Sequence, residues 1–213
     1  MDSNGAHAHA WAEAFRRNGF PVTYEEVRRL IGMGTDKLVP KLSGVKKGDP
    51  RYRRISELHG AIFMHDYFRK IKPLPRALDL LVDLKNRGLR LGIASSAKKE
   101  DLDRLLDLLG ARELFDPFPT TKNVKESKPD PDLIQKALQY LKVGRGEAVY
   151  IGDTPFDVEA AKKTGVRVIA VRCGGWMDSD LHAAEIYDDP ADILEHLQND
   201  KIPGFRIPAL KKN

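Results

Sequence analysis

The sequence feature that most constrains the fold is a short apolar run that ends in two acids, Ala148-Val149-Tyr150-Ile151-Gly152-Asp153-Thr154-Pro155-Phe156-Asp157. A short apolar run that stops abruptly at polar residues is typical of a buried strand in a parallel sheet. Ligands of open α/β sheets bind just beyond the carboxyl ends of such strands. Asp153 and Asp157 therefore lie where a ligand is expected to bind.

Spacing alone leaves two interpretations of these acids open. Two carboxylates at the edge of a sheet suit a hard divalent cation, which takes oxygen ligands. In the second interpretation, Asp153 caps the helix that begins near Phe156, and Asp157 occupies its first turn, where acids are favoured.

Length and composition indicate one large domain, or a domain with an insert, in a chain of 213 residues. The single cysteine, Cys173, excludes an internal disulfide and a metal cluster held by cysteines alone. No stretch has the length and apolar character of a membrane span, and the N-terminus lacks the apolar region of a signal peptide. We therefore expect a cytoplasmic protein without a membrane partner.

The formal charge of +5 comes from 36 Lys and Arg against 31 Asp and Glu. The basic residues are spread along the chain and mixed with acids, and the densest groups, Arg51-Tyr52-Arg53-Arg54 and Lys211-Lys212, are short. Nucleic-acid binding would need a basic stripe on one face, so no nucleic-acid partner is expected. A mild positive field that attracts small anionic metabolites fits this charge better.

Residues 1–72 carry only helical signals. Ala10, Ala14 and Phe15 have the spacing of one helix face, and Gly19 ends that helix. Thr23 and Glu26 form a capping box that opens a helix over 24–31. Further helical patterns follow at 35–42 and 55–70.

From residue 73 the pattern alternates between helices and strands. We expect helices at 75–87, 99–109, 131–141, 156–163 and 191–197. Strands are expected at 89–94, 148–151 and 166–171, with weaker ones at 115–120 and 185–187. Such alternation predicts βαβ units and a parallel sheet. The predicted organisation is thus an all-helical domain over 1–72 and an α/β domain over 73–213.

Three strands of the second region are followed by residues that can bind a phosphoryl group. Ser95 and Ser96 follow the first strand, Lys128 lies in Ser127-Lys128-Pro129-Asp130-Pro131 after the weak strand, and Asp153 with Asp157 follow the third. These loops open at the same edge of a parallel sheet. The hydroxyls would donate to phosphoryl oxygens, the lysine would offset their charge, and the acids would hold Mg²⁺. Taken singly, Ser95 could be a helix cap and Lys128 a solvated loop lysine.

In order and spacing, these segments resemble the second, third and fourth motifs of the haloacid dehalogenase-like (HAD) hydrolase superfamily. Within it the chain is most similar to the helical-cap phosphatases and phosphomutases, the relatives of phosphoglycolate phosphatase and β-phosphoglucomutase. The resemblance implies a Rossmannoid parallel sheet with an inserted all-helical cap. The segment from Asp2-Ser3-Asn4 to Ala10-Trp11 resembles the link between core and cap.

The resemblance also implies roles for individual residues. Ser95, with Ser96, would bind the phosphoryl group of a small phosphorylated metabolite, and Lys128 would stabilise its charge. Asp153 would ligate Mg²⁺, and Asp157 would support the metal or the nucleophile. His7 would lie on the cap hinge near the substrate.

One departure from the family pattern limits the expected activity. The family's first motif, a central strand ending in Asp-x-Asp-Gly-Thr, supplies the aspartyl nucleophile and the acid/base, and this chain lacks it. Asp101 and Asp103 are most simply surface acids of a helix. We therefore expect a sheet without its central first strand and a chain that is inactive as given, most economically explained by a truncated gene model.

A pseudo-hydrolase that binds a phosphorylated ligand or a protein, and a sugar-phosphate mutase, remain as alternatives; the metal acids argue against a dehalogenase.

Overall fold

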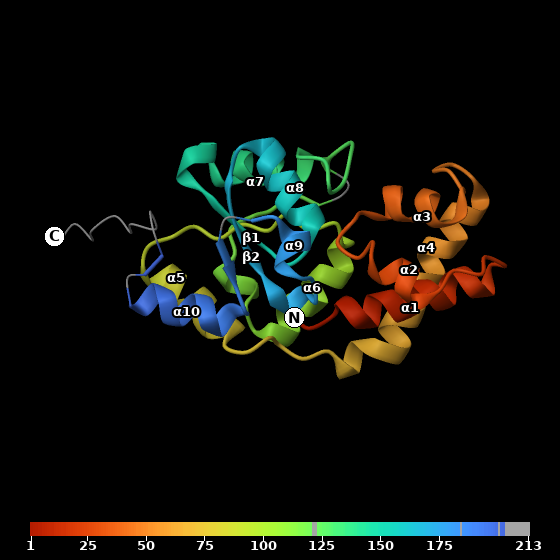
Figure 1. Cartoon of the computed structure of the whole chain (residues 1–213), viewed down its shortest axis with the longest axis horizontal. Coiled ribbons are helices and arrows are strands. Elements are labelled where there is room, and N and C mark those ends of the chain that lie inside the picture. Colours follow the sequence, from red (N-terminus) through yellow and green to blue (C-terminus); the bar gives the residue numbers. More distant parts are fainter. Residues whose placement is uncertain (121–122, 184, 200, 203–213) are drawn as a thin grey trace.

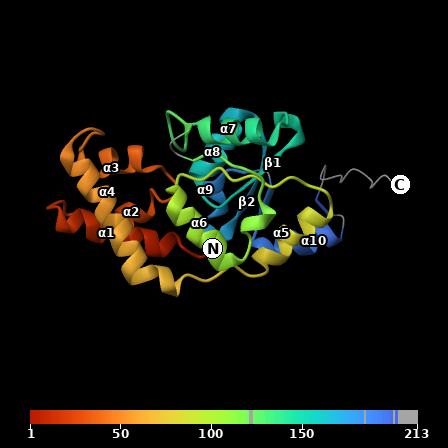
Figure 2. The same cartoon turned by 180° about the vertical axis from the view of Figure 1, so that it is seen from behind.

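A computed structural model describes residues 1–120, 123–183, 185–199 and 201–202. Figures 1 and 2 show two parts side by side: a group of helices from the first 72 residues, and an α/β part from the rest. The helices of the first part are α1 Asn4–Arg17, α2 Tyr24–Arg28, α3 Thr35–Ser43 and α4 Pro50–Ile62, followed by a π-helical turn, η1 Phe63–Tyr67, and a 3₁₀ turn, η2 Phe68–Lys70.

The helical part has its own apolar core. Small and aromatic side chains of α1, among them Ala14 and Phe15, pack with those of α4 and the π-helical turn. The expected capping box is present: the Thr23 hydroxyl accepts from the Glu26 amide at 3.2 Å, and the Glu26 carboxylate accepts from the Thr23 amide at 2.8 Å. The helix that it opens ends at Arg28, earlier than the predicted residue 31. A bridge between Asp2 and Lys72 brings the two ends of this part together.

Among the described residues, the α/β part has three parallel strands, β1 Val149–Gly152, β2 Arg167–Val171 and β3 Glu185–Tyr187, in the order β1-β2-β3. Its helices are α5 Ala77–Asn86, α6 Lys99–Leu109, α7 Asp132–Leu141, α8 Pro155–Thr164, α9 Asp178–Leu181 and α10 Pro190–Gln198. Short 3₁₀ turns are η3 Arg112–Leu114, η5 Arg145–Glu147 and η6 Arg172–Gly174. The predicted parallel α/β fold is confirmed.

Helices cover both faces of this sheet. Because successive side chains of a strand point to opposite faces, Ile169 and Val171 of β2 pack with α5 and α10, whereas Val168 and Ala170 pack with α7 and α8. Figure 1 shows these two helical layers above and below the strands. The layers leave the carboxyl ends of the strands facing the helical part.

The strands predicted at 89–94 and 115–120 are wrong, because neither segment has the paired backbone of a strand. The two segments instead contact each other: the Asp116 amide donates to the Leu91 carbonyl at 2.8 Å, and the Asp116 carboxylate accepts from the Leu91 amide at 3.1 Å. A strand forms only where a neighbouring strand pairs with it. Among the described residues β1 is an edge strand that pairs only with β2, so neither segment extends the sheet. Ile151, expected to be buried, is accordingly 38% exposed.

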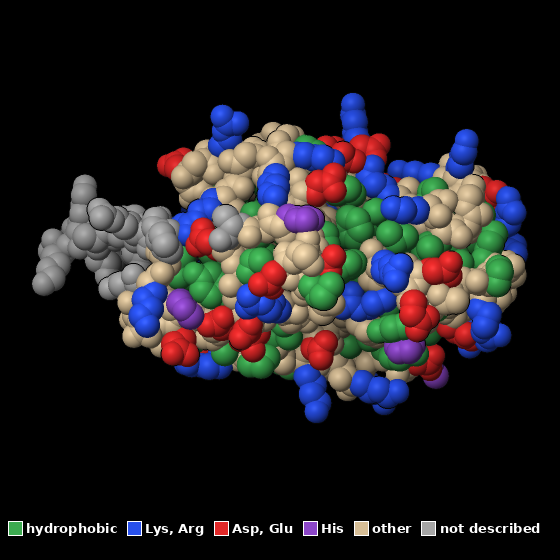
Figure 3. Space-filling view, in the orientation of Figure 1, with side chains coloured by type: hydrophobic (Ala, Val, Ile, Leu, Met, Phe, Trp, Pro, Cys, Tyr) green, Lys and Arg blue, Asp and Glu red, His purple; other side chains and the backbone are tan. Residues whose placement is uncertain are grey.

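The remaining fold expectations concern the ends of the chain and the membrane. Most of the C-terminal segment 202–213 lies outside the described residues. Among the helices that are described, none combines the length and apolar character needed to cross a membrane. Figure 3 shows basic and acidic side chains intermixed over the visible face, in agreement with the charge pattern of the sequence.

Candidate active site

The turn between β1 and α8 is built around Thr154. Its hydroxyl accepts from the Asp157 amide at 3.3 Å and donates to the Asp157 carboxylate at 2.6 Å, and its own amide donates to the same carboxylate at 3.1 Å. Thr154 is therefore the N-cap of α8, and the interpretation of Asp153 as that cap is wrong. Asp157 occupies the first turn, as that interpretation expected.

A buried ion pair joins the predicted Lys128 to Asp157. Lys128 Nζ donates to Asp157 Oδ1 at 2.6 Å, and Tyr150 Oη donates to the same oxygen at 2.8 Å. Burial would lower the pKa of Lys128, but the charge of Asp157 outweighs it and holds that pKa above its ordinary value. Burial likewise favours a neutral Asp157, yet the attraction of Lys128 keeps its pKa below the ordinary value. Both groups are thus charged at neutral pH.

Asp153 lies beside this pair with a weaker set of partners. One of its carboxylate oxygens accepts from Asn4 Nδ2 of α1 at 2.8 Å. Burial, followed by repulsion from Asp157, raises the pKa of Asp153, and the bond from Asn4 opposes that rise. The three charged side chains, Lys128, Asp153 and Asp157, sum to one negative charge when all are ionised.

This donor set fits a magnesium ion that is completed by other ligands. Mg²⁺ is commonly held by one or two carboxylates, with water and phosphate oxygens in the other positions. A cation at Asp153 would offset both its burial and the neighbouring Asp157 charge. Both oxygens of Asp157 already accept bonds within the protein, so Asp153 is the more available ligand. Within the described ranges, no group of three or more His, Cys, Asp or Glu side chains is arranged to hold a metal.

The predicted serine loop lies close to this cluster. Tyr150 Oη, which bonds Asp157, also lies 3.3 Å from the carbonyl oxygen of Ala94, the residue before Ser95. Ser95 Oγ accepts from the Ala97 amide at 3.1 Å, the bond of a local turn, so its own proton can still be donated. Ser96 Oγ is buried and has no hydrogen-bond partner among the described residues. An orphaned buried hydroxyl is the kind of group that a bound ligand can satisfy.

His7 is held in a different cluster, inside the helical part. His7 Nδ1 and His59 Nε2 are 3.3 Å apart, and the His7 ring stacks on Phe63 at a centroid distance of 3.9 Å. Burial lowers the pKa of His7 to about 4. His7 follows Asn4 by three residues on α1, so the two share a helix face. The ring contacts of His7 are with His59 and Phe63, both in the helical part, whereas the contact to Asp153 is made by Asn4.

Tyr150 and Asn4 are site residues that the sequence interpretation missed. Tyr150 was counted as an apolar strand residue, although its hydroxyl needs a partner when buried, and this could have drawn attention to the acid seven residues later. Its pKa is raised by burial and by the Asp157 charge. Asn4 carries no comparable sequence signal, because its contact to Asp153 spans 149 residues.

Comparison with known proteins shows the family of the chain. The family model described as haloacid dehalogenase-like hydrolase matches residues 1–171. The chain therefore belongs to the haloacid dehalogenase-like hydrolase family, a family of enzymes.

The relatives include phosphatases. The chain is 28% identical to a phosphoglycolate phosphatase of Rhodospirillum rubrum over 205 residues, covering 91% of this chain and 85% of the relative. It is 34% identical to the pyrophosphatase PpaX of Bacillus velezensis over 121 residues, or 57% of this chain and about half, 54%, of that relative. The chain also spans about half the length, 48%, of a PpaX-type relative from Caldanaerobacter subterraneus.

Solved structures show the same fold. A hydrolase from Pseudomonas syringae is 29% identical with a TM-score of 0.86, covering 93% of each chain. CbbY from Rhodobacter sphaeroides, solved in complex with phosphate, is 26% identical with a TM-score of 0.74, covering 90% of each chain. The β-phosphoglucomutase from Clostridium difficile, at 20% identity and a TM-score of 0.80 over 93% of this chain and 91% of that chain, shares the fold.

Proposed function

We propose that this site serves Mg²⁺-dependent hydrolysis of a small phosphomonoester in the cytoplasm, and that these 213 residues alone bind phosphate without turning it over. The observation that carries the proposal is the buried Lys128–Asp157 pair beside Asp153. A fixed ammonium and a carboxylate with a raised pKa are the groups that a phosphate with its metal ion would need.

Each residue has a definite task in this proposal. Lys128, already oriented by Asp157, offsets negative charge on the phosphoryl oxygens. Ser95 and Ser96 donate hydroxyl protons to those oxygens, and Asp153 ligates Mg²⁺. Asp157 keeps Lys128 charged and in place, which makes it a positioning residue in this scheme. Bound Mg²⁺ would supply electrostatic stabilisation of the transferring group.

The second half of the proposal follows from the acids around the site. Covalent hydrolysis through an aspartyl-phosphate needs a carboxylate that is free to attack phosphorus. Asp157 already binds Lys128, Tyr150 and Thr154, and Asp153 would be committed to the metal. The helix acid Asp103 is paired with Lys99 at 2.6 Å and Arg112 at 2.9 Å. None of these three acids is available as a nucleophile.

The test is hydrolysis of p-nitrophenyl phosphate with Mg²⁺ present. We expect the 213-residue chain to show only background rates. Adding about a dozen residues ahead of Met1, a strand that ends in Asp-x-Asp-Gly-Thr-Leu, should create activity. That activity should vanish when the first added Asp is changed to Asn, and it should drop sharply with Lys128→Ala.

Two outcomes would contradict the proposal. Mg²⁺-dependent turnover by the 213-residue chain would mean that an acid assigned here to structure or metal is the nucleophile. If the extended chain stays inactive but still binds phosphate, a non-catalytic ligand-binding protein becomes the better conclusion. Isothermal titration with Mg²⁺ and orthovanadate measures that binding, and Asp153→Ala is expected to weaken it.

A further inference from the structure

Besides the bond from Asn4 to Asp153, the helical part contacts the loops of the candidate site through the segment Gly32–Lys37, which runs into the first turn of α3. Gly32 has a φ of 103°, and a Cβ at this position would overlap the Thr154 side chain. Gly34 is buried, and a Cβ there would overlap Ser127 Oγ. The two glycines thus let this segment approach the loops that carry Thr154 and Lys128 more closely than any side chain would allow.

Asp36 and Gly34 of this segment form hydrogen bonds with Ser127 and with the backbone of Lys128. The Asp36 carboxylate accepts from Ser127 Oγ, and also from the Ser127 amide at 3.3 Å. The Gly34 amide donates to the Lys128 carbonyl at 3.2 Å. The peptide unit from Ser127 to Lys128 is therefore held from the helical part, while the Lys128 ammonium is held by Asp157.

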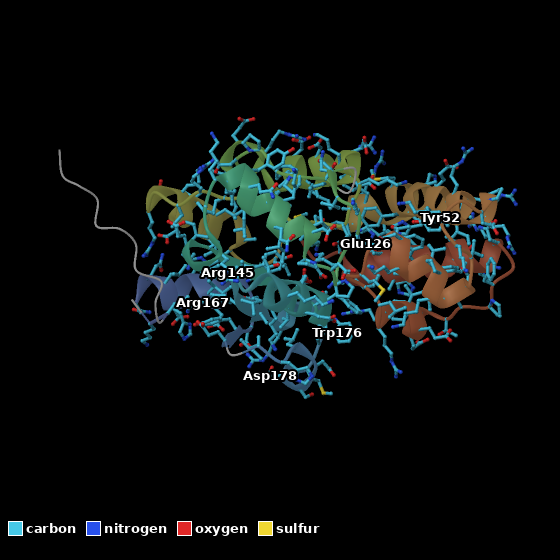
Figure 4. All side chains as sticks on the ribbon, turned by 90° about the horizontal axis from the view of Figure 1, so that it is seen from above. Tyr52, Glu126, Arg145, Arg167, Trp176 and Asp178 are labelled. Atoms are coloured by element: carbon cyan, nitrogen blue, oxygen red, sulfur yellow. The ribbon has the colours of Figure 1, made fainter. Side chains whose placement is uncertain are left out.

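Two partly exposed ion pairs of Lys37 lie next to this contact. Lys37, next to Asp36, lies 2.6 Å from the Asp130 carboxylate and 2.8 Å from that of Glu126. Figure 4 shows Glu126 at the border between the helical part and the α/β part. Such partly exposed pairs contribute little, whereas Ser127, only 4% exposed, would lose two hydrogen bonds without Asp36.

We propose that Asp36 is a positioning residue that couples docking of the helical part to the placement of the Lys128 ammonium. With Asp36 on Ser127, the Lys128 backbone is fixed and its side chain is confined to Asp157. Without Asp36, Ser127 loses its two hydrogen bonds to the helical part, and Lys128 can leave Asp157 for solvent. This inference rests on the proposed role of Lys128 in phosphate binding, although its structural half can be measured without phosphate.

The first experiment measures how well Lys128 is protected. The full chain is treated with an N-hydroxysuccinimide ester of acetate, and acetylation of each lysine is followed by peptide mass spectrometry. Lys128 should react slowly in the wild type, because it is 8% exposed and paired. In Asp36→Ala its rate should rise by about fivefold or more through local opening of the loop. Asp36→Asn, whose amide oxygen can still accept from Ser127, should give an intermediate rate.

Matched controls separate positioning from general loss of structure. Glu57→Ala removes an exposed carboxylate from α4 of the same helical part and should leave Lys128 protected. Acetylation of the exposed Lys46 should be equal in all variants. Ser127→Ala removes only the hydroxyl bond to Asp36 and keeps the amide bond, so it should raise the Lys128 rate less than Asp36→Ala, and the double variant should equal Asp36→Ala. An unchanged Lys128 rate in folded Asp36→Ala would overturn the inference.

The second experiment measures affinity for inorganic phosphate with Mg²⁺ by calorimetry. Asp36→Ala should weaken it by about tenfold, and Glu57→Ala by less than about twofold. If the wild type binds no phosphate but Asp36 still controls Lys128 protection, the proposed function fails and the positioning role stands. If phosphate binds equally to the wild type and Asp36→Ala while Lys128 becomes reactive, the coupling to the site is wrong.

Discussion

The Lys128–Asp157 pair is the residue-scale feature on which the site depends. Taking two charges out of water is costly, and their attraction repays this only where geometry and further hydrogen bonds are good. Asp157 meets that condition, since Tyr150 and Thr154 fill its remaining acceptor positions. The result is a cation that is oriented before any ligand arrives.

We expect Lys128→Met to destabilise the protein by about 3–5 kcal/mol, because it leaves the Asp157 carboxylate buried without its counter-ion. Urea unfolding followed by circular dichroism measures this change. The double variant Lys128→Met with Asp157→Asn should recover part of the loss, since no buried charge then remains unpaired. As a control, Lys163→Met breaks a partly exposed pair with Glu159 and should cost less than about 1 kcal/mol. Equal losses for both lysines would contradict the importance of burial.

At the scale of elements, local signals predicted the helices well. The capping box at Thr23 and the stops at Gly110 and Gly165, both in left-handed conformation, act within a few residues of their own helix. Strands differ, because a strand exists only if a neighbour pairs with it. The strand predicted at 89–94 did not form, because among the described residues β1 pairs only with β2.

The site residues were predictable to the extent that they follow a strand or a loop motif. Asp157 and Lys128 were found in this way, and the structure brings them together. The roles of Asn4 and Asp36 were not predictable, because they depend on contacts across 149 and 91 residues of chain. Those contacts depend on how the helical part packs against the α/β part, and no local sequence pattern predicts that packing.

The packing of α1 against α4 gives a pH-dependent prediction. Burial lowers the pKa of His7 from 6.5 to about 4, so between these values the unfolded chain binds a proton that the folded chain does not. Stability should therefore fall as the pH drops through this range and should be unaffected by His7 above it. The expected loss is on the order of 2 kcal/mol by about pH 4. His59, whose pKa is also lowered by burial and by the His7 and Lys98 charges, adds to it.

Thermal unfolding between about pH 7 and pH 4.5 tests whether stability falls as the pH drops. His7→Gln should flatten the dependence, because a neutral side chain replaces the titrating ring. His65→Gln is the matched control, because it removes an exposed histidine from the same helical part, and its pH slope is compared with that of His7→Gln. A slope that is equal in His7→Gln and the wild type would show that other groups cause the acid sensitivity.

At the scale of the whole molecule, the docked helical part fixes the arrangement within one chain, whereas the free edge of β1 favours association between chains. The segment Gly32–Lys37 packs against the loops that carry Thr154 and Lys128, and its hydrogen bonds to Ser127 and Lys128 favour one arrangement of the two parts. Within the described part of the chain, by contrast, β1 pairs with β2 alone, which leaves its other edge free beside the exposed Ile151. Exposed strand edges of this kind template association between chains.

We therefore expect the 213-residue chain to self-associate as its concentration rises, and Ile151→Lys to reduce that association. A lysine on an edge strand places charge where a second chain would have to pair, which is how natural sheets protect their edges. Light scattering after gel filtration, over a series of concentrations, measures the mass of each variant. Met177→Lys is the control, because Met177 is 68% exposed but lies outside the strands. If both substitutions lower the mass equally, general surface hydrophobicity drives association. If neither does, the edge of β1 is not the contact, and the extended chain proposed above should gain no stability from a strand added beside it.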